Sequence, residues 1–411
     1  MNLPPSRSPL RVMHLISCLD VGGAEMMLSK LLGAMGREQF TSVVWSMTPP
    51  GRIGEKIRAL GIEVRSLDMG RGIPDPRAFF KLRSAIREWK PDVLQTWMYH
   101  ADFLGALVAR FSGNVPVIWN IRNSEFQPGA YGRTTLPLAK LCGRISSSMP
   151  VRILSCSEQG RRVHEELGYD AGKMLVIPNG FDLSHYNPQP DAREFCETHF
   201  GISKTAEALA VVGRYHPQKD HKTFLTAAGI VAKRFPDLHF ILCGDGVTGE
   251  NPTLVSQAKE AGISSHIHLL GRREPEQLTR IMSRSILVSS SRFGEGFPNV
   301  VGEAMACGAI CVVTNSGDSG WIVGDTGVVV QPGSPDDLAA GIVRVLTMSA
   351  EARSALGAAA MQRVADDFTI QKIARRYEDL YRQVHNREPI NNSKPQPDTA
   401  NADPRGNRKE L

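Results

Sequence analysis

The sequence predicts an α/β protein built from two doubly wound, Rossmann-like domains. Its 411 residues, 42% of them apolar, are enough to fill two cores. Strand-like and helix-like segments alternate almost throughout, which is typical of parallel sheets covered by helices on both faces. The alternation falls into two series. The expected strands cover 11–19, 41–47, 63–67, 92–98, 115–121, 152–156 and 174–178 in the first series, and 208–214, 238–243, 266–270, 286–290, 310–314 and 327–330 in the second.

Segments rich in turn-forming residues suggest where the domains meet. The Pro- and Asn-rich stretch Asn187 to Asp191 predicts a boundary that divides the chain into 10–188 and 189–369. A new helical pattern begins after Thr369 and covers 370–386. The last segment, 387–411, is polar and contains four prolines, so we expect it to be disordered.

Composition excludes several classes of protein. The formal charge of +6 is modest for this length and does not indicate a nucleic-acid partner. No apolar stretch reaches membrane-spanning length, and the first nine residues lack the apolar core of a signal peptide, so we expect a cytoplasmic protein. The seven cysteines are scattered, odd in number and without a Cys-x-x-Cys pair. They predict neither a disulfide framework nor a zinc site, and most should be buried.

Two basic segments of the first domain suggest contact with a surface. One predicted helix carries Lys81, Arg83, Arg87 and Lys90. In and just before the apolar segment 134–149, basic residues lie close to leucines and an isoleucine. Such a face can rest on an anionic membrane, but a solvated helix face over a core predicts the same pattern. The residues of this second segment are Arg133, Lys140 and Arg144, with Leu136, Leu138, Leu141 and Ile145.

Glu295 and Glu303 are the first candidate site residues, because they bracket a turn between a predicted strand and a predicted helix. The apolar run 286–288 reads as the strand and 300–306 as the helix. Ligands of α/β sheets bind at such strand ends. A helix N-terminus favours phosphate and carboxylates accept sugar hydroxyls, so the turn suits a polyhydroxylated ligand that carries phosphate. A single carboxylate here would be explained equally well as a helix cap.

Arg214 and Lys219 supply the complementary charge. A predicted strand ends at Gly213 and delivers both cations to a loop before a helix that begins near Lys222. A guanidinium fork and a mobile ammonium together can neutralise a pyrophosphate. Alone, two basic residues in a loop are usually just solvated.

Together with the two glutamates, these cations occur in the order found in the retaining glycosyltransferases of family 4. The chain resembles that family from Arg11 to Asn386. The resemblance implies the GT-B arrangement, in which two Rossmann-like domains face each other across a cleft, the first on the acceptor side and the second binding the nucleotide sugar. It also implies that helix 370–386 returns to pack on the first domain. Further matching segments are Val21 to Glu25, Val176 to Asp182, Cys243 to Gly246, Leu269 to Arg272 and Glu295 to Gly308.

The resemblance assigns a role to each of these residues. Arg214 and Lys219 would bind the diphosphate and stabilise the charge that grows as the sugar leaves. Glu295 would hold hydroxyls of the donor sugar and Glu303 those of the ribose. The catalytic candidates are Glu295, Arg214, Lys219 and Arg122. The predicted donor-binding residues are Gly22, Gly23, Gly213, Arg214, Lys219, Gly244, Gly271, Arg272, Glu295, Gly296, Phe297, Pro298, Asn299, Val300 and Glu303.

Arg122 departs from the family pattern. Many members carry a histidine at the end of the fifth strand, where this chain has Arg122. Arginine stays protonated and cannot act as a general base, so it would instead hold a phosphate or an acidic group of the donor or acceptor. In a retaining front-face transfer the leaving phosphate oxygen itself accepts the acceptor proton. His100 is a second, acceptor-side candidate, with a plain position at a helix start beside Asp102 as the alternative interpretation.

The predicted function is transfer of a hexosyl or N-acetylhexosaminyl group from a nucleoside diphosphate sugar to an acceptor hydroxyl, with retention of configuration. A UDP-sugar is favoured. The chain is similar to bacterial enzymes of surface polysaccharide, lipopolysaccharide or lipid-linked glycan synthesis, which implies a glycan or lipid-linked acceptor and a position at the inner membrane face. No cofactor or metal is expected, because Arg214 and Lys219 neutralise the diphosphate and no Asp-x-Asp cluster follows a strand.

Two other functions remain as alternatives. A nucleotide-sugar epimerase can share this architecture. A non-catalytic nucleotide-sugar-binding protein can also share it but is disfavoured, because Arg214, Lys219, Glu295 and Glu303 are all present. A dehydrogenase is disfavoured because the first loop reads Gly22-Gly23 without Gly-x-Gly-x-x-Gly spacing.

Overall fold

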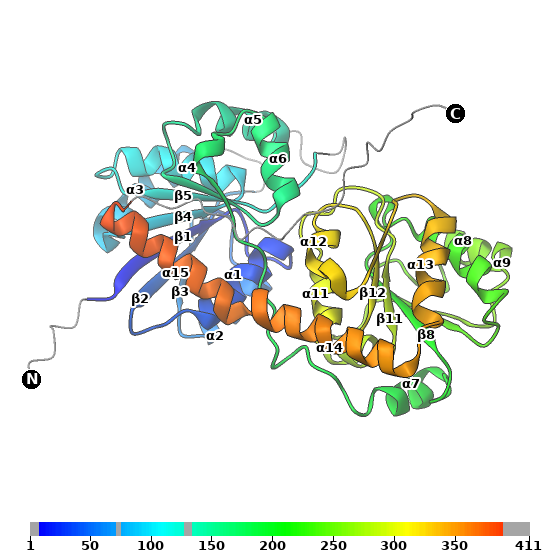
Figure 1. Cartoon of the computed structure of the whole chain (residues 1–411). Helices are drawn as coiled ribbons and strands as arrows, with labels where there is room; N and C mark the ends of the chain where they lie inside the picture. The colour runs from blue at the N-terminus through cyan, green and yellow to red at the C-terminus, as the bar shows by residue number, and fades with distance from the viewer. Residues whose placement is uncertain (1–7, 71–74, 127–133, 389–411) are drawn as a thin grey trace, which may run out of the picture.

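The computed structural model describes residues 8–70, 75–126 and 134–388. Figure 1 shows two α/β domains side by side, with helices on both faces of each sheet. Every strand pairing is parallel, as predicted for doubly wound domains. The predicted fold class is therefore confirmed, and all thirteen expected strands are present.

The N-terminal sheet has seven strands in the order β3-β2-β1-β4-β5-β6-β7. The strand order changes direction between β1 and β4, and ligands of such sheets bind beside that switch point. Its strands are β1 (Leu10–Ile16), β2 (Phe40–Ser46), β3 (Glu63–Ser66), β4 (Val93–Trp97), β5 (Val117–Ile121), β6 (Arg152–Ser155) and β7 (Met174–Val176). Its helices are α1 (Gly23–Ala34), α2 (Arg52–Ala59), α3 (Pro76–Trp89), α4 (Tyr99–Arg110), α5 (Thr135–Ile145) and α6 (Glu158–Glu166).

The C-terminal sheet has six strands in the order β10-β9-β8-β11-β12-β13, with its switch point between β8 and β11. Its strands are β8 (Ala208–Val212), β9 (His239–Cys243), β10 (Ile267–Leu269), β11 (Ile286–Ser289), β12 (Cys311–Thr314) and β13 (Val328–Val330). The helices that follow in the chain are α7 (Ala192–Phe200), α8 (His221–Ala232), α9 (Pro252–Glu260), α10 (Pro275–Arg284), α11 (Asn299–Ala306), α12 (Ser319–Val323), α13 (Pro335–Leu346), α14 (Ala350–Asp367) and α15 (Ile370–Asn386).

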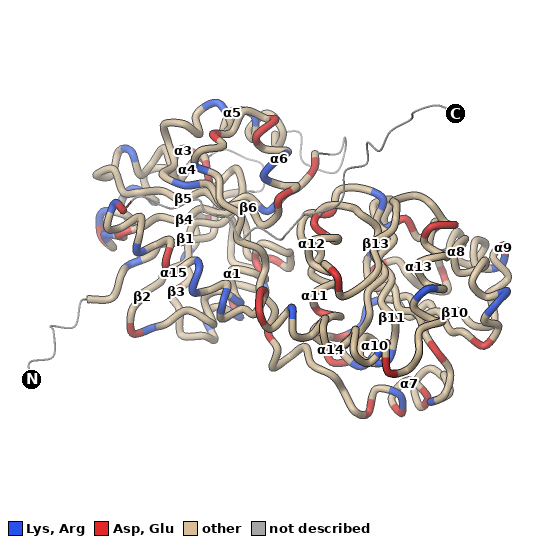
Figure 2. Tube along the Cα trace, in the orientation of Figure 1, with Lys and Arg blue, Asp and Glu red and all other residues tan. Residues whose placement is uncertain are grey.

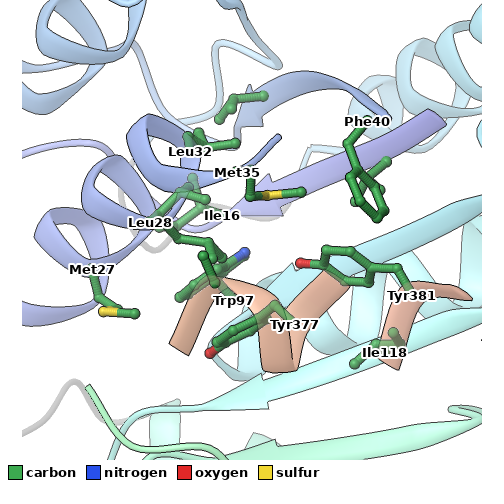
Figure 3. Packing of buried hydrophobic residues seen from close by; sticks show 14 of the residues in the cluster. Ile16, Met27, Leu28, Leu32, Met35, Phe40, Trp97, Ile118, Tyr377 and Tyr381 are labelled. Carbon is green, nitrogen blue, oxygen red and sulfur yellow. The ribbon is translucent and has the colours of Figure 1, made fainter. Parts of the chain in front are cut away.

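The last helix, α15, lies against the N-terminal domain although it ends the described chain (Figure 1). Apolar residues recur every three or four positions along it, so one face is buried. Figure 3 shows Tyr377 and Tyr381 of that face beside Trp97 and Phe40, and the rings of Tyr377 and Trp97 are stacked with centroids 6.4 Å apart. The Gly36 N–H also donates to a carboxylate oxygen of α15 over 2.8 Å.

The chain crosses between the domains twice, and the two crossings are hydrogen-bonded to each other. The Phe181 N–H donates to the Phe368 carbonyl over 2.8 Å, and the Ile370 N–H donates to the Phe181 carbonyl over 2.9 Å. Phe181 is fully buried in the core of the second domain. The chain therefore enters that domain before the stretch 187–191 that composition suggested.

Several other expectations concern the whole chain. Cys18 is half-buried and the other six cysteines are buried, as predicted. Within the described residues, no helix is long and apolar enough to cross a membrane. Most of the segment expected to be disordered, 389–411, lies outside the described residues.

Candidate functional site

The strand ends of the C-terminal sheet are drawn together by glycines. The Gly213 N–H, after β8, donates to the Cys243 carbonyl over 2.8 Å, and the Gly244 N–H, after β9, donates to the Gly271 carbonyl over 2.9 Å. Gly244 has φ +150°, and a Cβ there would lie 2.0 Å from the Gly213 carbonyl oxygen. These predicted donor-binding glycines thus let neighbouring loops meet at the carboxyl edge of the sheet.

Lys219 and Glu295 form an ion pair at this edge. The Lys219 ammonium donates to Glu295 Oε1, and the Ser291 hydroxyl donates to the same oxygen over 2.6 Å. The aliphatic part of Lys219 passes Gly213, where a Cβ would lie 3.3 Å from its Cδ and Cε atoms. Glu295 is 6% exposed, so these two partners replace the water that its side chain loses on burial. The structure therefore joins two residues that the sequence analysis assigned to different parts of the ligand.

Arg214 and Arg272 follow strands β8 and β10, and both are exposed. The backbone at Arg214 is fixed at the rim of the site, the carboxyl edge of the C-terminal sheet, because the next residue, Tyr215, donates its N–H to the Asp245 carbonyl over 2.7 Å. Neither arginine is buried with the Lys219–Glu295 pair. Each is therefore available to a ligand that reaches the rim.

The turn after Glu295 combines a core side chain with a helix start. Phe297 is 6% exposed and packs against the rings of Phe181 and Phe368 at centroid distances of 6.0 and 5.6 Å. Its side chain therefore contributes to the core, leaving only its backbone for a ligand. Helix α11 begins at Asn299, one residue earlier than predicted. Pro298 has no N–H, so the helix N–H groups available here are those of Asn299 and Val300.

Glu303 lies one turn into α11 and meets a residue of the other domain. Lys30 of α1 approaches Glu303 Oε1 to 4.0 Å, and its ammonium lies 5.7 Å from the ring centroid of Tyr186. Burial raises the pKa of Glu303, while the charge of Lys30 and a hydrogen bond with Tyr186 lower it. Sequence reasoning missed Lys30 and Tyr186, because neither belongs to a recognisable motif.

Arg122 reaches the donor side through two asparagines. Its guanidinium donates to Asn179 Oδ1, and Asn179 Nδ2 donates over 2.6 Å to Oδ1 of Asn299 at the start of α11. The guanidinium also lies 5.6 Å from the ring centroid of Trp97. Its Nη1 atom is buried without a hydrogen-bond partner among the described residues. Arg122 is thus held in place by the protein, with part of its hydrogen-bonding capacity unused.

His100 and the first glycine loop lie on the N-terminal side. His100 is half-buried in the first turn of α4, and burial lowers its pKa. The residue before this helix, Met98, has φ 73°, an uncommon and strained value for a side chain of its size. A Cβ on Gly22 would lie 2.3 Å from a carboxylate oxygen of Glu25, whereas a Cβ on Gly23 would meet nothing within 4 Å. Of the two predicted glycines, Gly23 is therefore the one beside open space.

The two basic helices differ in how their charges are used. On α5, Lys140 and Arg144 are exposed beside Leu136 and Leu141, which are 37% and 39% exposed. Figure 2 shows basic segments along α5 and charges of both signs spread over both domains. On α3, Lys81 is paired with Asp68 at 2.7 Å and Arg83 donates to the Phe111 carbonyl. Leu138 and Ile145 pack against the core, and Arg133 lies outside the described residues.

No group of three or more His, Cys, Asp or Glu side chains able to hold a metal ion occurs in the described part of the chain. The expectation of a metal-free reaction stays a prediction.

Comparison with known proteins places this geometry in a family. Residues 21–185 match a family model described as Glycosyltransferase Family 4, and residues 193–363 match one described as Glycosyl transferases group 1. The chain is 28% identical over 322 residues to EpsF of Bacillus subtilis, which carries the name of a glycosyltransferase; the match covers 75% of this chain and 80% of the relative. It is 24% identical over 315 residues to a UDP-Gal:alpha-D-GlcNAc-diphosphoundecaprenol alpha-1,3-galactosyltransferase of Escherichia coli, with the same coverage of 75% and 80%.

Among solved structures, the fold is similar to that of the Anabaena protein HepE in complex with UDP. The TM-score is 0.77 at 19% identity, and the superposition covers 91% of this chain and 100% of the other.

Proposed function

The chain belongs to the group 1 glycosyltransferases, and from this premise we propose that it moves a sugar from a nucleoside diphosphate sugar to an acceptor hydroxyl with retention of configuration. The observation that carries the proposal is the buried Lys219–Glu295 pair at the carboxyl edge of the C-terminal sheet. A cation beside a carboxylate suits a ligand in which a diphosphate is joined to a hydroxyl-rich sugar.

The donor would lie along this edge. Arg214 and Lys219 would bind the diphosphate, assisted by the N–H groups at the starts of α1 and α11. Glu295 would accept hydroxyls of the transferred sugar. Glu303, which lies one turn into α11, would accept the ribose hydroxyls. When the donor binds, the Lys219 ammonium would interact with the diphosphate as well as with Glu295. Recognition of the diphosphate and recognition of the sugar would therefore be coupled.

Bond breaking would depend on cations and not on a protein base. As the bond between the anomeric carbon and the phosphate oxygen breaks, its electron pair passes to the diphosphate, whose growing charge Arg214 and Lys219 stabilise. The acceptor hydroxyl attacks the same face of the sugar and gives its proton to the leaving phosphate oxygen. Arg122 cannot take that proton. Its hydrogen bond to Asn179 instead orients the start of α11 through Asn299.

A UDP-sugar donor and a lipid-linked or polysaccharide acceptor are favoured by the relatives. The name of the Escherichia coli relative specifies UDP-Gal and an acceptor on diphosphoundecaprenol, and HepE has been solved with UDP-glucose. Such an acceptor would be met at a membrane, and the exposed face of α5 suits an anionic membrane surface because leucines and basic residues alternate on it.

Transfer is tested with a panel of UDP- and other nucleotide sugars and lipid-linked acceptors, and the anomeric configuration of the product is read by NMR. An inverted linkage would contradict retention. Incubation without acceptor separates transfer from epimerisation, because an epimerase would change the donor sugar there and a transferase would leave it intact or slowly hydrolyse it.

Membrane contact is tested by sedimentation with anionic vesicles. Leu136→Asp with Leu141→Asp should reduce the bound fraction, whereas Val255→Asp, at a residue 43% exposed on α9 of the other domain, should not. Equal binding of both variants would exclude α5 as the contact.

A further inference from the structure

The N-terminus of α6 is capped by both domains. Ser157, its own N-cap residue, accepts a hydrogen bond from the Gly160 N–H over 2.8 Å. The N–H groups of Glu158 and Gln159 donate instead to the carboxylate of Asp318, over 2.8 and 3.1 Å. Asp318 directly precedes α12 in the C-terminal domain. Two of the helix N–H groups in the N-terminal domain are therefore satisfied from across the cleft.

The backbone around Asp318 lies on the turn that carries Glu295. The Asp318 N–H donates to the Gly296 carbonyl over 2.9 Å. Gly317 has φ +58°, and a Cβ there would lie 1.8 Å from the Glu295 carbonyl oxygen. Only glycine permits this approach. Asp318 is thus tied to the Glu295 turn by its backbone and to α6 by its side chain.

The same turn touches the N-terminal domain at a second place. A Cβ on Gly296 would lie 3.1 Å from the Ser124 hydroxyl oxygen and 3.4 Å from that of Ser157, and the Ser124 hydroxyl donates to the Gly294 carbonyl over 3.2 Å. The Glu295 turn is therefore held between the domains, with Asp318 supplying the charged contact.

The physical chemistry of this contact favours a reversible closure. A carboxylate at a helix N-terminus gains two charge-assisted hydrogen bonds and a favourable interaction with the helix dipole. Asp318 is 4% exposed, and burial raises its pKa to about 6, which shows that removing the carboxylate from water opposes the contact. When the domains separate, water can satisfy both the carboxylate and the two N–H groups. Closure therefore exchanges hydrogen bonds with water for hydrogen bonds within the protein.

We propose that Asp318 is a positioning residue: by capping α6 it closes the domains and holds the Glu295 turn in the arrangement used for sugar transfer. This inference rests on the proposed function for its catalytic part. Its structural part, closure through Asp318, does not depend on any reaction.

The N–H partner can be removed without touching Asp318. Glu158 is the first residue of α6, a position where proline is favoured, and Ser157 has φ −153° and ψ 152°, the extended backbone that precedes a proline. Glu158→Pro therefore deletes one of the two N–H groups that donate to Asp318, the one with the shorter bond, while the helix start is kept. Glu158→Ala is the matched control, because it removes the same side chain, including its pairing with Arg161, and keeps the N–H.

Closure is measured first, by small-angle X-ray scattering of the full chain without substrate and with UDP. Asp318→Asn and Glu158→Pro should give a larger radius of gyration than the wild type, and Glu158→Ala should not. Urea unfolding of each variant checks that the domains are intact. If Glu158→Pro scatters like Glu158→Ala, the proposed closure is wrong, and this holds even where Asp318→Asn fails to fold.

Catalysis is measured next. Asp318→Asn and Glu158→Pro should each lower kcat about tenfold, the size expected when one charge-assisted hydrogen bond is lost, and the double variant should be no worse than either alone. Affinity for free UDP, set by Arg214 and Lys219, should stay near the wild-type value. Unchanged kcat in Glu158→Pro would overturn the positioning role. Closure effects in a protein that transfers no sugar would refute the proposed function and leave the closure intact.

Discussion

The two sides of the cleft use their charged residues differently. On the C-terminal side, Lys219 and Glu295 lie at the edge of one sheet and neutralise each other within that domain. On the N-terminal side, Lys30 and Arg122 act across the cleft, Lys30 toward Glu303 and Arg122 through Asn179 toward Asn299.

This difference predicts different consequences of mutation. Arg214, Lys219 and Glu295 of the C-terminal side should determine whether the donor binds and reacts at all, whereas Asp318 of the same side acts across the cleft as a positioning residue. Residues of the N-terminal side should determine how well these donor-binding residues are positioned. Variants of the two sides can therefore be ranked by expected effect.

Lys219→Ala should have the largest effect. It removes a cation from the diphosphate and, among the described residues, leaves the buried Glu295 carboxylate with only Ser291, so transfer should fall about 10²- to 10³-fold and stability by about 1–3 kcal/mol. Arg214→Ala is the control, because Arg214 is exposed and its loss should slow transfer with little change in stability. Transfer kinetics and urea unfolding distinguish the two. Equal stability of both variants would show that the Lys219–Glu295 pair contributes nothing to the fold.

Glu295→Gln should remove most transfer activity while the protein stays folded, since an amide is a weaker acceptor for sugar hydroxyls than a carboxylate.

Glu295→Ala should leave affinity for the free nucleoside diphosphate near wild type, whereas Arg214→Ala should weaken it about tenfold. Calorimetry with UDP makes the comparison. A loss of UDP affinity as great as that of Arg214→Ala would mean that Glu295 positions Lys219 and does not select the sugar.

Arg122→Met should lower kcat about tenfold and change UDP affinity little, because the guanidinium orients Asn179 and Asn299 and does not meet the diphosphate in this arrangement. Steady-state kinetics and calorimetry are both needed. If UDP binding weakens as in Lys219→Ala, Arg122 contacts the nucleotide directly and the contrast between the two sides disappears.

Lys30→Met should shift the pH dependence of donor binding. Burial already raises the pKa of Glu303 and Lys30 opposes that rise, so removing Lys30 should raise the pKa further. Donor affinity is full above this pKa and is lost as pH falls through it, so KM for the donor should begin to rise at a higher pH in the variant. The profile is measured from pH about 5 to 8. Lys56→Met, at an exposed lysine of α2, should reproduce the wild-type profile.

Chelation should have the smallest effect. With Arg214 and Lys219 neutralising the diphosphate, EDTA should leave the transfer rate unchanged. Loss of activity that Mg²⁺ or Mn²⁺ restores would show that the protein cations are insufficient.

The sequence alone determined the sheets, and it predicted where the candidate site lies. Parallel strands buried on both faces require continuous apolar runs, and these runs are visible without a structure. Glu295 and Lys219 were predicted because each follows a strand end, where backbone geometry already directs ligand binding, and Glu303 because it closes the segment that begins at Glu295. For Phe297 the prediction concerned its backbone N–H, and only the structure shows that its side chain is part of the core.

Only the tertiary structure decided which residues meet. The pairing of Lys219 with Glu295 joins residues 76 positions apart, and the contacts of Asp318 with α6 join residues about 160 apart. Propensity and periodicity act over a few residues, so neither carries information about such contacts. The Lys219–Glu295 contact depends on the neighbouring positions of β8 and β11 in the C-terminal sheet. The contacts of Asp318 depend on how the two domains approach each other, which is set by the paired crossings at Phe181 and Ile370 and by the packing of α15.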